Sequence, residues 1–179
     1  SLLFLQESEA AHSRVLKGLS LASKIPMLPM LADGLYGAPN LPVEIAGLRF
    51  TNPVGLAAGM DKSAAAVPMW ERLGFGFSEL GGVTRHAQSG NDAPRMFRAV
   101  ADRALVNRMG FNNPGADTFA GALSEWHARD DWPSHPIGIN LGKSKITPLE
   151  EAAEDYTFTF RALQELADFF VVNISSPNT

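Results

Sequence analysis

Short apolar runs alternate with amphipathic stretches along the chain after residue 50. Four of these runs have the length of buried strands and lie at 53–58, 75–80, 136–141 and 169–174. Helices are expected at 64–73, from about Pro114 onward and at 148–167. Buried strands separated by helices are typical of parallel sheets, so the pattern predicts an α/β fold.

A hairpin is expected just before the first of these strands. Residues 43–50 alternate between apolar and polar positions on either side of Ala46-Gly47, a pair that suits a tight turn. The hairpin opens the α/β part of the chain, so we predict two parts, a helical segment at 1–38 and the α/β part at 39–179.

The first 38 residues have apolar side chains at helical spacing among charged ones. Two short amphipathic helices are expected there, with apolar positions at Leu2, Leu3, Phe4, Leu5, Val15, Leu16, Leu19, Leu21 and Ala22. Further apolar side chains follow at 25–31, but Pro26 and Pro29 are expected to stop any helix. The segment fits either a helical pair packed on a larger body or a surface for a membrane or an apolar ligand.

Each expected strand ends in a loop rich in glycine, amide or other polar residues. These loops lie at 59–62, 81–84, 140–143 and 173–178. A (β/α)8 barrel gathers functional groups at the ends of successive strands, whereas a doubly wound sheet usually carries a G-x-G-x-x-G fingerprint, which the first loop lacks. The sequence therefore predicts the first four strands of a TIM barrel, and their open edges indicate a piece of a longer protein.

Composition and charge exclude several classes of function. Hydrophobic residues make up 45% of the chain, and 15 basic against 19 acidic residues give a net charge of -4, so nucleic acid is not an expected partner. The absence of cysteine excludes disulfides, thiolate metal sites and a thiol base. No apolar stretch reaches the roughly 18 to 20 residues that cross a bilayer, and the chain does not open like a secretory signal.

Two amide-rich stretches are candidates for binding a polar ligand. In 173–179, amides and hydroxyls crowd the end of an apolar strand, and 107–115 leads into a helix that begins near Pro114. An Asn/Ser turn and a polar loop with a helix-initiating proline are the structural alternatives.

Lys62 is the candidate for charge chemistry, because it follows the first strand. Its ammonium group could face a carboxylate, a phosphate or a reduced flavin, or form a Schiff base, and a solvated loop lysine is the ordinary alternative. Asp61 could pair with Lys62 or cap the next helix. Asn140 can donate and accept at once, which suits the amide edge of a flavin or pyrimidine.

No metal site is predicted from the histidines. They show no ligand spacing, and all of them are expected on surface segments: His12, His86, His127 and His135.

Five stretches resemble the motifs of the dihydroorotate dehydrogenase family. They are NPVGLAAGMDK at 52–62, GNDAPRMF at 90–97, NRMGFNN at 107–113, GINLGK at 138–143 and NISSPNT at 173–179. The stretches occur in the family's order and cover nearly the whole chain after residue 40, so together they are very specific.

The resemblance is to the quinone-dependent class 2 of this family. Cytosolic members carry a cysteine base in the loop after the fourth strand, whereas this chain has Ser176 at that position and no cysteine. The serine class also has an N-terminal helical pair that forms a quinone tunnel at the membrane, and 4–12 looks like its opening. The resemblance thus implies peripheral attachment to the cytoplasmic face of the cell membrane.

The activity implied by the resemblance is oxidation of (S)-dihydroorotate to orotate in de novo pyrimidine (UMP) biosynthesis, with FMN as hydride acceptor and quinone as final acceptor. Ser176 would take the C5 proton while hydride passes from C6 to flavin N5, and a hydroxyl base needs a relay for that proton. FMN would be lined by Ala58, Gly59, Met60, Asp61, Lys62, Gly82, Asn140 and Asn173. Dihydroorotate would be held by Lys62, Asn107, Arg108, Met109, Gly110, Phe111, Asn173 and Asn178.

One position departs from the family's pattern. Members commonly carry threonine or serine where this chain has Gly82, so a backbone contact to flavin could survive but a hydroxyl contact could not. The FMN phosphate is expected on loops after strands seven and eight, so residues 1–179 alone are not expected to hold flavin.

Other interpretations remain open on the residues alone. An aldolase-like barrel with Lys62 as a Schiff-base amine would be trapped by borohydride and would be colourless. A non-catalytic half-barrel scaffold is favoured only if 179 residues are the whole product. Flavin barrels that act on other pyrimidines or on tRNA uridine usually carry a cysteine in the catalytic loop, which this chain lacks.

Overall fold

The centre of the molecule is a sheet of four parallel strands. The computed structural model describes residues 2–129 and 131–174. The strands pair in the order β3 (Gly55–Leu56), β4 (Phe77–Val83), β7 (Ile137–Gly142) and β8 (Phe169–Asn173). Because every neighbouring pair is parallel, the four carboxyl ends lie at one edge of the sheet. The four predicted strands and their parallel arrangement are confirmed.

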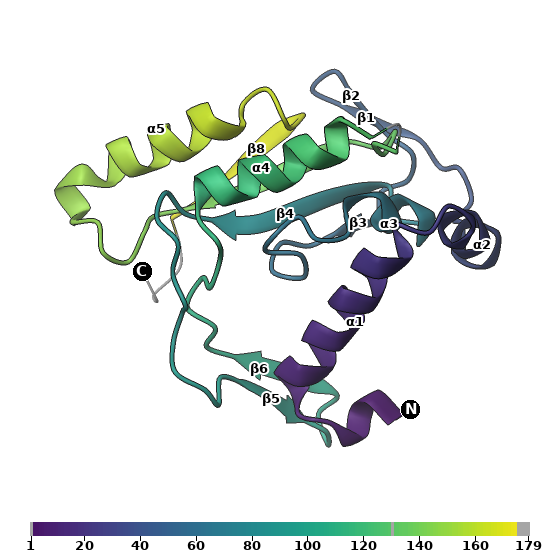
Figure 1. Ribbon diagram of the computed structural model, residues 1–179, viewed down its shortest axis with the longest axis horizontal. Coiled ribbons are helices and arrows are strands. Elements are labelled where there is room, and N and C mark those ends of the chain that lie inside the picture. The colour runs from purple at the N-terminus through teal and green to yellow at the C-terminus, as the bar shows by residue number, and fades with distance from the viewer. Residues whose placement is uncertain (1, 130, 175–179) are drawn as a thin grey trace.

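Three helices pack against this sheet. They are α3 (Val67–Arg72), α4 (Ala116–His127) and α5 (Ala152–Leu163), the last preceded by a single 3-10 turn, η2 (Leu149–Glu151). Figure 1 shows α4 and α5 side by side along one face of the sheet. Helix α3 begins later than the predicted residue 64, because a turn held by the Asp61 side chain occupies the preceding residues.

The main hydrophobic core lies between the sheet and these helices. Strand β7 is buried along its whole length, as expected for a strand with neighbours on both sides. Alternate residues of a strand point to the same face, so one face of β7 packs against the helices. The fully buried apolar side chains of this core include Leu80, Ile137, Ile139, Phe119, Leu123 and Leu163.

Aromatic rings close the opposite face of the sheet near its amino end. Phe77 and Phe169 lie over glycines of the neighbouring strands, since a Cβ at Gly55 would stand 2.1 Å from the Phe77 ring and one at Gly138 would stand 2.2 Å from the Phe169 ring. Phe50 packs on both rings, at centroid distances of 5.2 and 6.4 Å. The glycines therefore make room for this ring cluster, and larger residues would not fit there.

Phe50 comes from the predicted hairpin, which is confirmed. Strands β1 (Val43–Ile45) and β2 (Leu48–Phe50) pair antiparallel. Ala46 and Gly47 have φ of 51° and 80°, so both central residues lie in the left-handed region that a two-residue type I′ turn requires.

The N-terminal segment folds into a 3-10 turn and two helices: η1 (Leu2–Leu5), α1 (Ser8–Ala22) and α2 (Met27–Tyr36). The prediction that Pro26 and Pro29 stop any helix was wrong, because α2 starts directly after Pro26 and contains Pro29. Pro29 lies in the first helical turn, where backbone N–H groups have no partner within the helix, so the proline removes no hydrogen bond.

Among the described residues, no single helix has both the length and the apolar character needed to cross a bilayer. Helices α1 and α2 satisfy those two criteria only as a pair, and the pair is bent by 118° at the break between them.

A second hairpin was missed by the hydrophobic pattern. Strands β5 (Met96–Ala99) and β6 (Ala104–Asn107) pair antiparallel, and β6 is exposed along its whole length. A strand with no buried side gives no alternation signal in the sequence. Helix α1 packs against β5, and Figure 1 shows both on the side of the sheet away from α4 and α5.

Within the described residues the sheet is open, since β3 and β8 each pair on one side only. The α/β class is confirmed, and the geometry is that of a partial, unclosed barrel. Val172 on β8 and Ile174 just after it are exposed, as the outer strand of an incomplete sheet would show.

Candidate active site

A cavity of about 820 Å³ lies at the carboxyl ends of the strands, between the sheet, helix α1 and the β5–β6 hairpin. The strand ends and the segment after β6 line it with Leu56, Ala57, Ala58, Gly59, Met60, Lys62, Gly82, Met109, Gly110, Phe111, Asn140 and Asn173. Helix α1, the hairpin and Phe75 add Ser8, Ala11, His12, Val15, Phe75, Met96, Arg98, Leu105 and Asn107. The cavity thus combines mostly apolar walls with a lysine and three side-chain amides.

The loop after β3 is shaped by Asp61, whose side chain is fully buried. Its carboxylate accepts hydrogen bonds from the backbone N–H groups of Ser63, Ala65 and Ala66, at 2.8 to 3.3 Å, and from Nε1 of Trp70 at 3.2 Å. The side chain therefore points into the core and not into the cavity. The role of helix cap considered for Asp61 is not observed, because its carboxylate holds the turn that precedes α3 and no side-chain hydrogen bond caps the helix itself.

This turn presents the neighbouring Lys62 to the cavity. Its Nζ donates to Oδ1 of Asn112 at 2.9 Å. Burial lowers the pKa of the Lys62 ammonium below its ordinary value, the Arg95 guanidinium lowers it further, and the Glu9 carboxylate opposes both effects. Lys62 is thus a partly desolvated cation on the cavity wall. The alternative of an ordinary, fully solvated loop lysine does not hold.

Two amides line the same wall, Asn140 within the second half of β7 and Asn173 as the last residue of β8. Nδ2 of Asn140 donates to Oε1 of Glu79 at 2.7 Å, and Nδ2 of Asn173 donates to Oδ1 of Asn140 at 3.3 Å. The Tyr156 hydroxyl donates to the backbone oxygen of Asn173 at 2.8 Å. These contacts hold both amides at the cavity wall, where amides can both donate to and accept from the polar edge of a flat heterocycle.

The segment after β6 is folded by Asn113, which is buried at the base of the loop. Its Oδ1 accepts from the N–H groups of Thr84 and Gly115, at 3.2 and 2.9 Å, while its Nδ2 donates to Thr84 Oγ1 and to the Phe111 oxygen. These four hydrogen bonds of the Asn113 amide stabilise the loop. The sequence interpretation gave Asn113 no separate role, although a second asparagine before Pro114 is a turn-forming signal.

Gly82 and Phe111 meet on the cavity wall. A Cβ at Gly82 would stand 3.0 Å from the Phe111 ring and 3.3 Å from Oδ1 of Asn140, which is closer than ordinary van der Waals contact. The missing side chain at position 82 is therefore matched by the position of the Phe111 ring. A threonine or serine at position 82, as in the family's pattern, would therefore need the Phe111 ring to shift.

Helix α1 supplies four residues to the cavity that were not predicted as site residues. Ser8, Ala11, His12 and Val15 recur at helical spacing, so they share one face of the helix. The ring Nε2 of His12 lies 2.7 Å from the backbone oxygen of Met60, which fixes this face against the β3 loop. Their spacing was visible in the sequence, but the surface that this face contacts was not.

The structure brings most of the predicted site residues together. Lying on the cavity are Ala58, Gly59, Met60, Lys62, Gly82, Asn107, Met109, Gly110, Phe111, Asn140 and Asn173. Two predicted residues point elsewhere: Asp61 into the core, and Arg108 toward the backbone oxygen of Pro94, to which its Nη2 donates at 3.1 Å. Ser176 and Asn178 lie outside the described residues, so their predicted roles remain predictions.

The expectation that all four histidines are on the surface was wrong for His135, which is only 1% exposed. Its ring lies between Ser78 Oγ, at 3.0 Å from Nε2, and the Phe75 oxygen, at 2.8 Å from Nδ1. Burial lowers the pKa of this imidazole, against the raising effect of the Phe75 hydrogen bond. No group of three or more histidine, aspartate or glutamate side chains suited to a metal ion occurs within the described part of the chain.

Parallel strands whose carboxyl ends carry a lysine and amides around a mostly apolar cavity define an α/β protein with the usual form of a small-molecule site. The chain belongs to the dihydroorotate dehydrogenase family, whose model matches residues 40–179.

Curated relatives extend the similarity into the N-terminal helices. The dihydroorotate dehydrogenase (quinone) of Gloeobacter violaceus is 55% identical over 99% of this chain and 49% of its own length. That of Nostoc punctiforme is 58% identical over 97% of this chain and 47% of its own length. The chain thus spans about half the length of these relatives.

A solved structure shows the same fold for this region. The crystal structure of DHODH from Eimeria tenella in complex with ferulenol is 40% identical, with a TM-score of 0.72, over 89% of this chain and 44% of that one.

Proposed function

We propose that this chain is the N-terminal half of a quinone-dependent dihydroorotate dehydrogenase, an oxidoreductase of de novo pyrimidine biosynthesis. In this proposal residues 39–179 form the first half of a (β/α)8 barrel, and residues 1–38 form a quinone- and membrane-associated segment. Dihydroorotate would be oxidised to orotate, with FMN as the hydride acceptor and a quinone as the final electron acceptor. The names of the relatives support this proposal, because the similarity includes the N-terminal helices.

One observation carries the proposal: Lys62, Asn107, Asn140 and Asn173 line a single cavity with helix α1 as one of its walls. A carboxylate on the ligand would be stabilised by the Lys62 ammonium, and ring N–H and C=O groups would pair with the amides. Such a set of groups matches dihydroorotate, a heterocycle with one carboxylate and a row of ring amides.

The residues present fit the ring part of FMN. Small residues, Ala57, Ala58, Gly59 and Gly82, leave a flat apolar wall, and the amides of Asn140 and Asn173 stand at its edge. FMN, when bound, supplies the hydride acceptor. These residues would orient the ring and exclude water from its face, while the phosphate would be held by barrel loops that follow this half of the chain.

Proton removal is assigned to Ser176 on the basis of the sequence resemblance. A serine hydroxyl is a weak base at its ordinary acidity, so the loop after β8 would have to provide a relay for the proton. Lys62 would favour the developing charge on the substrate side of the cavity, because a desolvated cation interacts strongly with nearby anionic character.

The apolar part of the cavity suits the quinone. Ala11 and Val15 of helix α1 line it together with Met96 and Leu105 of the β5–β6 hairpin, so a flat apolar ring could enter between helix and hairpin. Arg98 and His12 are the polar groups on this side that could bind quinone oxygens.

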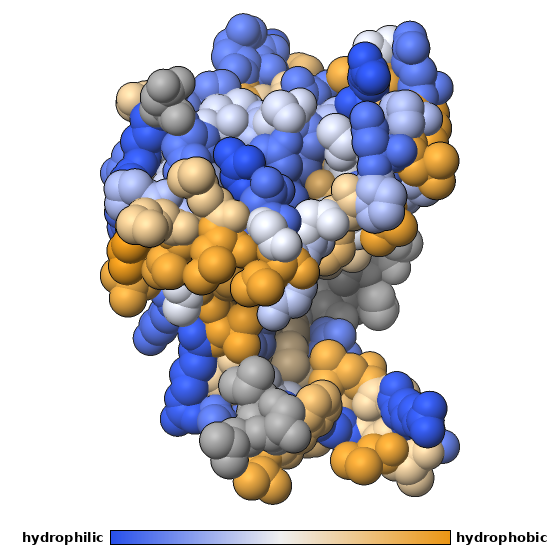
Figure 2. Space-filling model, turned by 90° about the vertical axis from the view of Figure 1, so that its right-hand side faces the viewer, coloured by the Kyte–Doolittle hydropathy of each residue, from blue (hydrophilic) through white to orange (hydrophobic). Residues whose placement is uncertain are grey.

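Helix α2 is the proposed contact with the cytoplasmic face of the cell membrane. It carries exposed apolar side chains at Met27, Leu28, Met30, Leu31, Leu35 and Tyr36. Figure 2 shows apolar side chains gathered in a band across this face of the molecule. A helix of this kind binds at a lipid surface with its apolar side chains in the headgroup region. Exposed cations at Lys17 and Lys24 of the adjoining segment would favour anionic lipids.

The test is an absorbance spectrum of the purified full-length protein, followed by anaerobic addition of dihydroorotate and then of a soluble quinone. Bleaching of the flavin band by dihydroorotate and its recovery with quinone are expected. A colourless protein that is trapped by borohydride through Lys62 would instead establish a Schiff-base enzyme, and a colourless, untrapped protein would establish a scaffold.

A further inference from the structure

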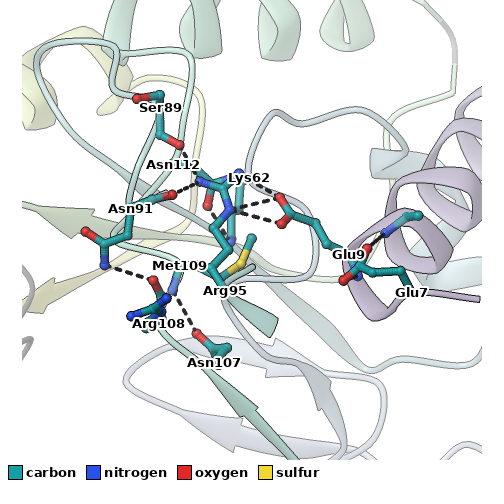
Figure 3. A network of polar contacts seen from close by, with 11 residues as sticks. Glu7, Glu9, Lys62, Ser89, Asn91, Arg95, Asn107, Arg108, Met109 and Asn112 are labelled. Atoms are coloured by element: carbon teal, nitrogen blue, oxygen red, sulfur yellow. Dashed lines mark hydrogen bonds and ion pairs between the residues drawn. The ribbon is translucent and has the colours of Figure 1, made fainter. Parts of the chain in front are cut away.

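An ion pair joins the N-terminal helix to the α/β body beside the candidate active site. Nε and Nη2 of Arg95 donate to the Glu9 carboxylate of helix α1, the shortest distance being 2.6 Å. Their side chains are only 15% and 23% exposed. Each group shifts the other in the direction expected of a strong pair, so the pKa of Glu9 is lowered and that of Arg95 is raised. Figure 3 shows this pair at the centre of a larger network.

The other edge of the Arg95 guanidinium holds a loop. Its Nη1 donates to the backbone oxygens of Ser89 and Asn91, at 2.6 and 2.8 Å. Two carbonyls and one carboxylate therefore share a single rigid fork, an arrangement that the point charge of a lysine cannot reproduce.

The loop held by Arg95 is itself bonded to the segment that carries the predicted substrate contacts. Asn91 donates from its backbone N to the Met109 oxygen at 3.0 Å and from Nδ2 to the Arg108 oxygen at 2.8 Å. Gly90 packs so closely there that a Cβ would stand 2.2 Å from the Met109 oxygen. A displacement of this loop would therefore displace residues 108–110.

The same segment reaches Lys62 three residues beyond Met109. Asn112 accepts the hydrogen bond from Nζ of Lys62, and the charges of Glu9 and Arg95 are both felt at that ammonium. Hydrogen bonds thus run from helix α1 through Arg95 and the loop to Met109, and the chain from Met109 to Asn112 completes the connection to the lysine of the cavity (Figure 3).

We propose that Arg95 is a positioning residue that ties Glu9 of helix α1 to the loop at 89–91 and thereby sets the geometry of residues 107–112 toward dihydroorotate. The inference rests on the proposed function. Helix α1 then has a second role besides lining the apolar part of the cavity: it helps to hold residues 107–112, which are predicted to contact the substrate. Contacts with substrate belong to the residues that Arg95 positions.

The test is made on the full-length flavoprotein. It measures the binding of orotate and the reduction of the flavin by dihydroorotate separately from the reoxidation of the flavin by quinone. Arg95→Lys keeps the charge but loses the fork, and Glu9→Gln keeps the shape but loses the ion pair. Both are expected to weaken orotate binding, measured by calorimetry and by the flavin difference spectrum. For Arg95→Lys the loss should be about 10- to 100-fold, because small misplacements of binding groups have effects of that size. The double variant should bind orotate no worse than Arg95→Lys, since both changes break one network.

Glu7→Gln is the matched control. Glu7 lies two residues before Glu9 and caps helix α1 through Oε1 and Oε2, and a glutamine retains one capping oxygen while removing the same charge. Its affinity for orotate should stay within about twofold of the wild type, because an exposed charge without a buried partner contributes little.

The proposal would be overturned if Arg95→Lys bound orotate within twofold of the wild type and only the reoxidation by quinone were slowed. Arg95 would then serve only to hold helix α1 on the body. If Arg95→Lys fails to fold with flavin, Glu9→Gln decides the question by the same measurement. A wild-type protein that neither binds orotate nor is bleached by dihydroorotate would show instead that the proposed function is wrong, before any variant is compared.

Discussion

Lys62 illustrates how the surroundings of one side chain decide what it can do. In the sequence it is a lysine after a short strand, and such lysines are usually solvated. In the structure the turn held by Asp61 places it on the cavity wall with Asn112 as its partner. Its lowered pKa follows from burial first and from Arg95 second.

Replacing Lys62 by methionine should lower the rate of flavin reduction by dihydroorotate about 100- to 1000-fold, because a preorganised cation at developing charge contributes that much. Anaerobic stopped-flow absorbance of the full-length protein measures this rate. The control is Lys145→Met, which removes an exposed cation from the loop after β7 and should leave the rate unchanged. Equal rates in the Lys62→Met variant and the wild type would exclude Lys62 from the site.

His135 is a residue whose effect is on stability. It is buried between Ser78 and the Phe75 oxygen, and burial lowers its pKa below the ordinary 6.5. In the unfolded chain the ring takes up a proton near pH 6.5, whereas in the folded protein it does not until a lower pH. The unfolded state therefore binds more protons below pH 6.5, and stability falls as the pH falls from there through the folded pKa.

The urea midpoint of the full-length protein should accordingly decrease from pH 7 to pH 5, and the decrease should be smaller in His135→Gln. His86→Gln, which changes an exposed histidine, should keep the pH dependence of the wild type. If His135→Gln and the wild type show the same slope of midpoint against pH, the histidine is not the titrating group.

At the scale of elements, helix α2 shows that the position of a proline matters more than its presence. Pro26 lies just before the helix and Pro29 within its first turn, so neither breaks an internal hydrogen bond. The apolar residues that follow are exposed, unlike those of α4, whose Phe119 and Leu123 are buried in the core. Helix α2 packs against α3, whereas α4 packs against both α3 and α5.

Replacing Met27, Met30 and Leu35 by serine should weaken binding of the full-length protein to anionic phospholipid vesicles by at least about tenfold, because each buried apolar side chain contributes roughly 1.5 to 3 kcal/mol. Vesicle co-sedimentation measures the change. Leu149→Ser is the control, since Leu149 is equally exposed but lies in η2. Unchanged sedimentation of the triple variant would remove α2 from the proposed membrane contact.

At the scale of the whole molecule, the four-stranded sheet has two open edges among the described residues. The cavity lies at the carboxyl ends of these four strands. Open edges and exposed apolar side chains such as Val172 are stabilised when further strands cover them. The relatives are about twice as long as this chain, which supports the proposal that a second half closes the barrel.

A polypeptide limited to residues 1–179 should therefore bind no FMN and should self-associate, whereas the full-length protein should be yellow and show a single species. Flavin absorbance and analytical ultracentrifugation of both proteins test this. Stoichiometric FMN on the 179-residue piece would place the phosphate site within this half and contradict the expectation from barrel geometry.

Local patterns were enough for the parallel strands, the tight hairpin turn at Ala46-Gly47, and the family. Each of these depends on neighbours in the chain: the length of an apolar run, the conformations that a glycine permits, or the order of residues in a motif. The strand-end location of Lys62, Asn140 and Asn173 was predictable for the same reason, because parallel strands bring their carboxyl ends to one edge.

Only the tertiary structure decided which way side chains face and what they meet. Asp61 turned into the core, Arg108 turned toward Pro94, and His135 was buried, although the sequence marks none of these outcomes. The pairing of Glu9 with Arg95 joins residues 86 positions apart. Contacts at such separations depend on how whole elements pack, and packing energy is a property of the assembled surfaces that no local run of residues encodes.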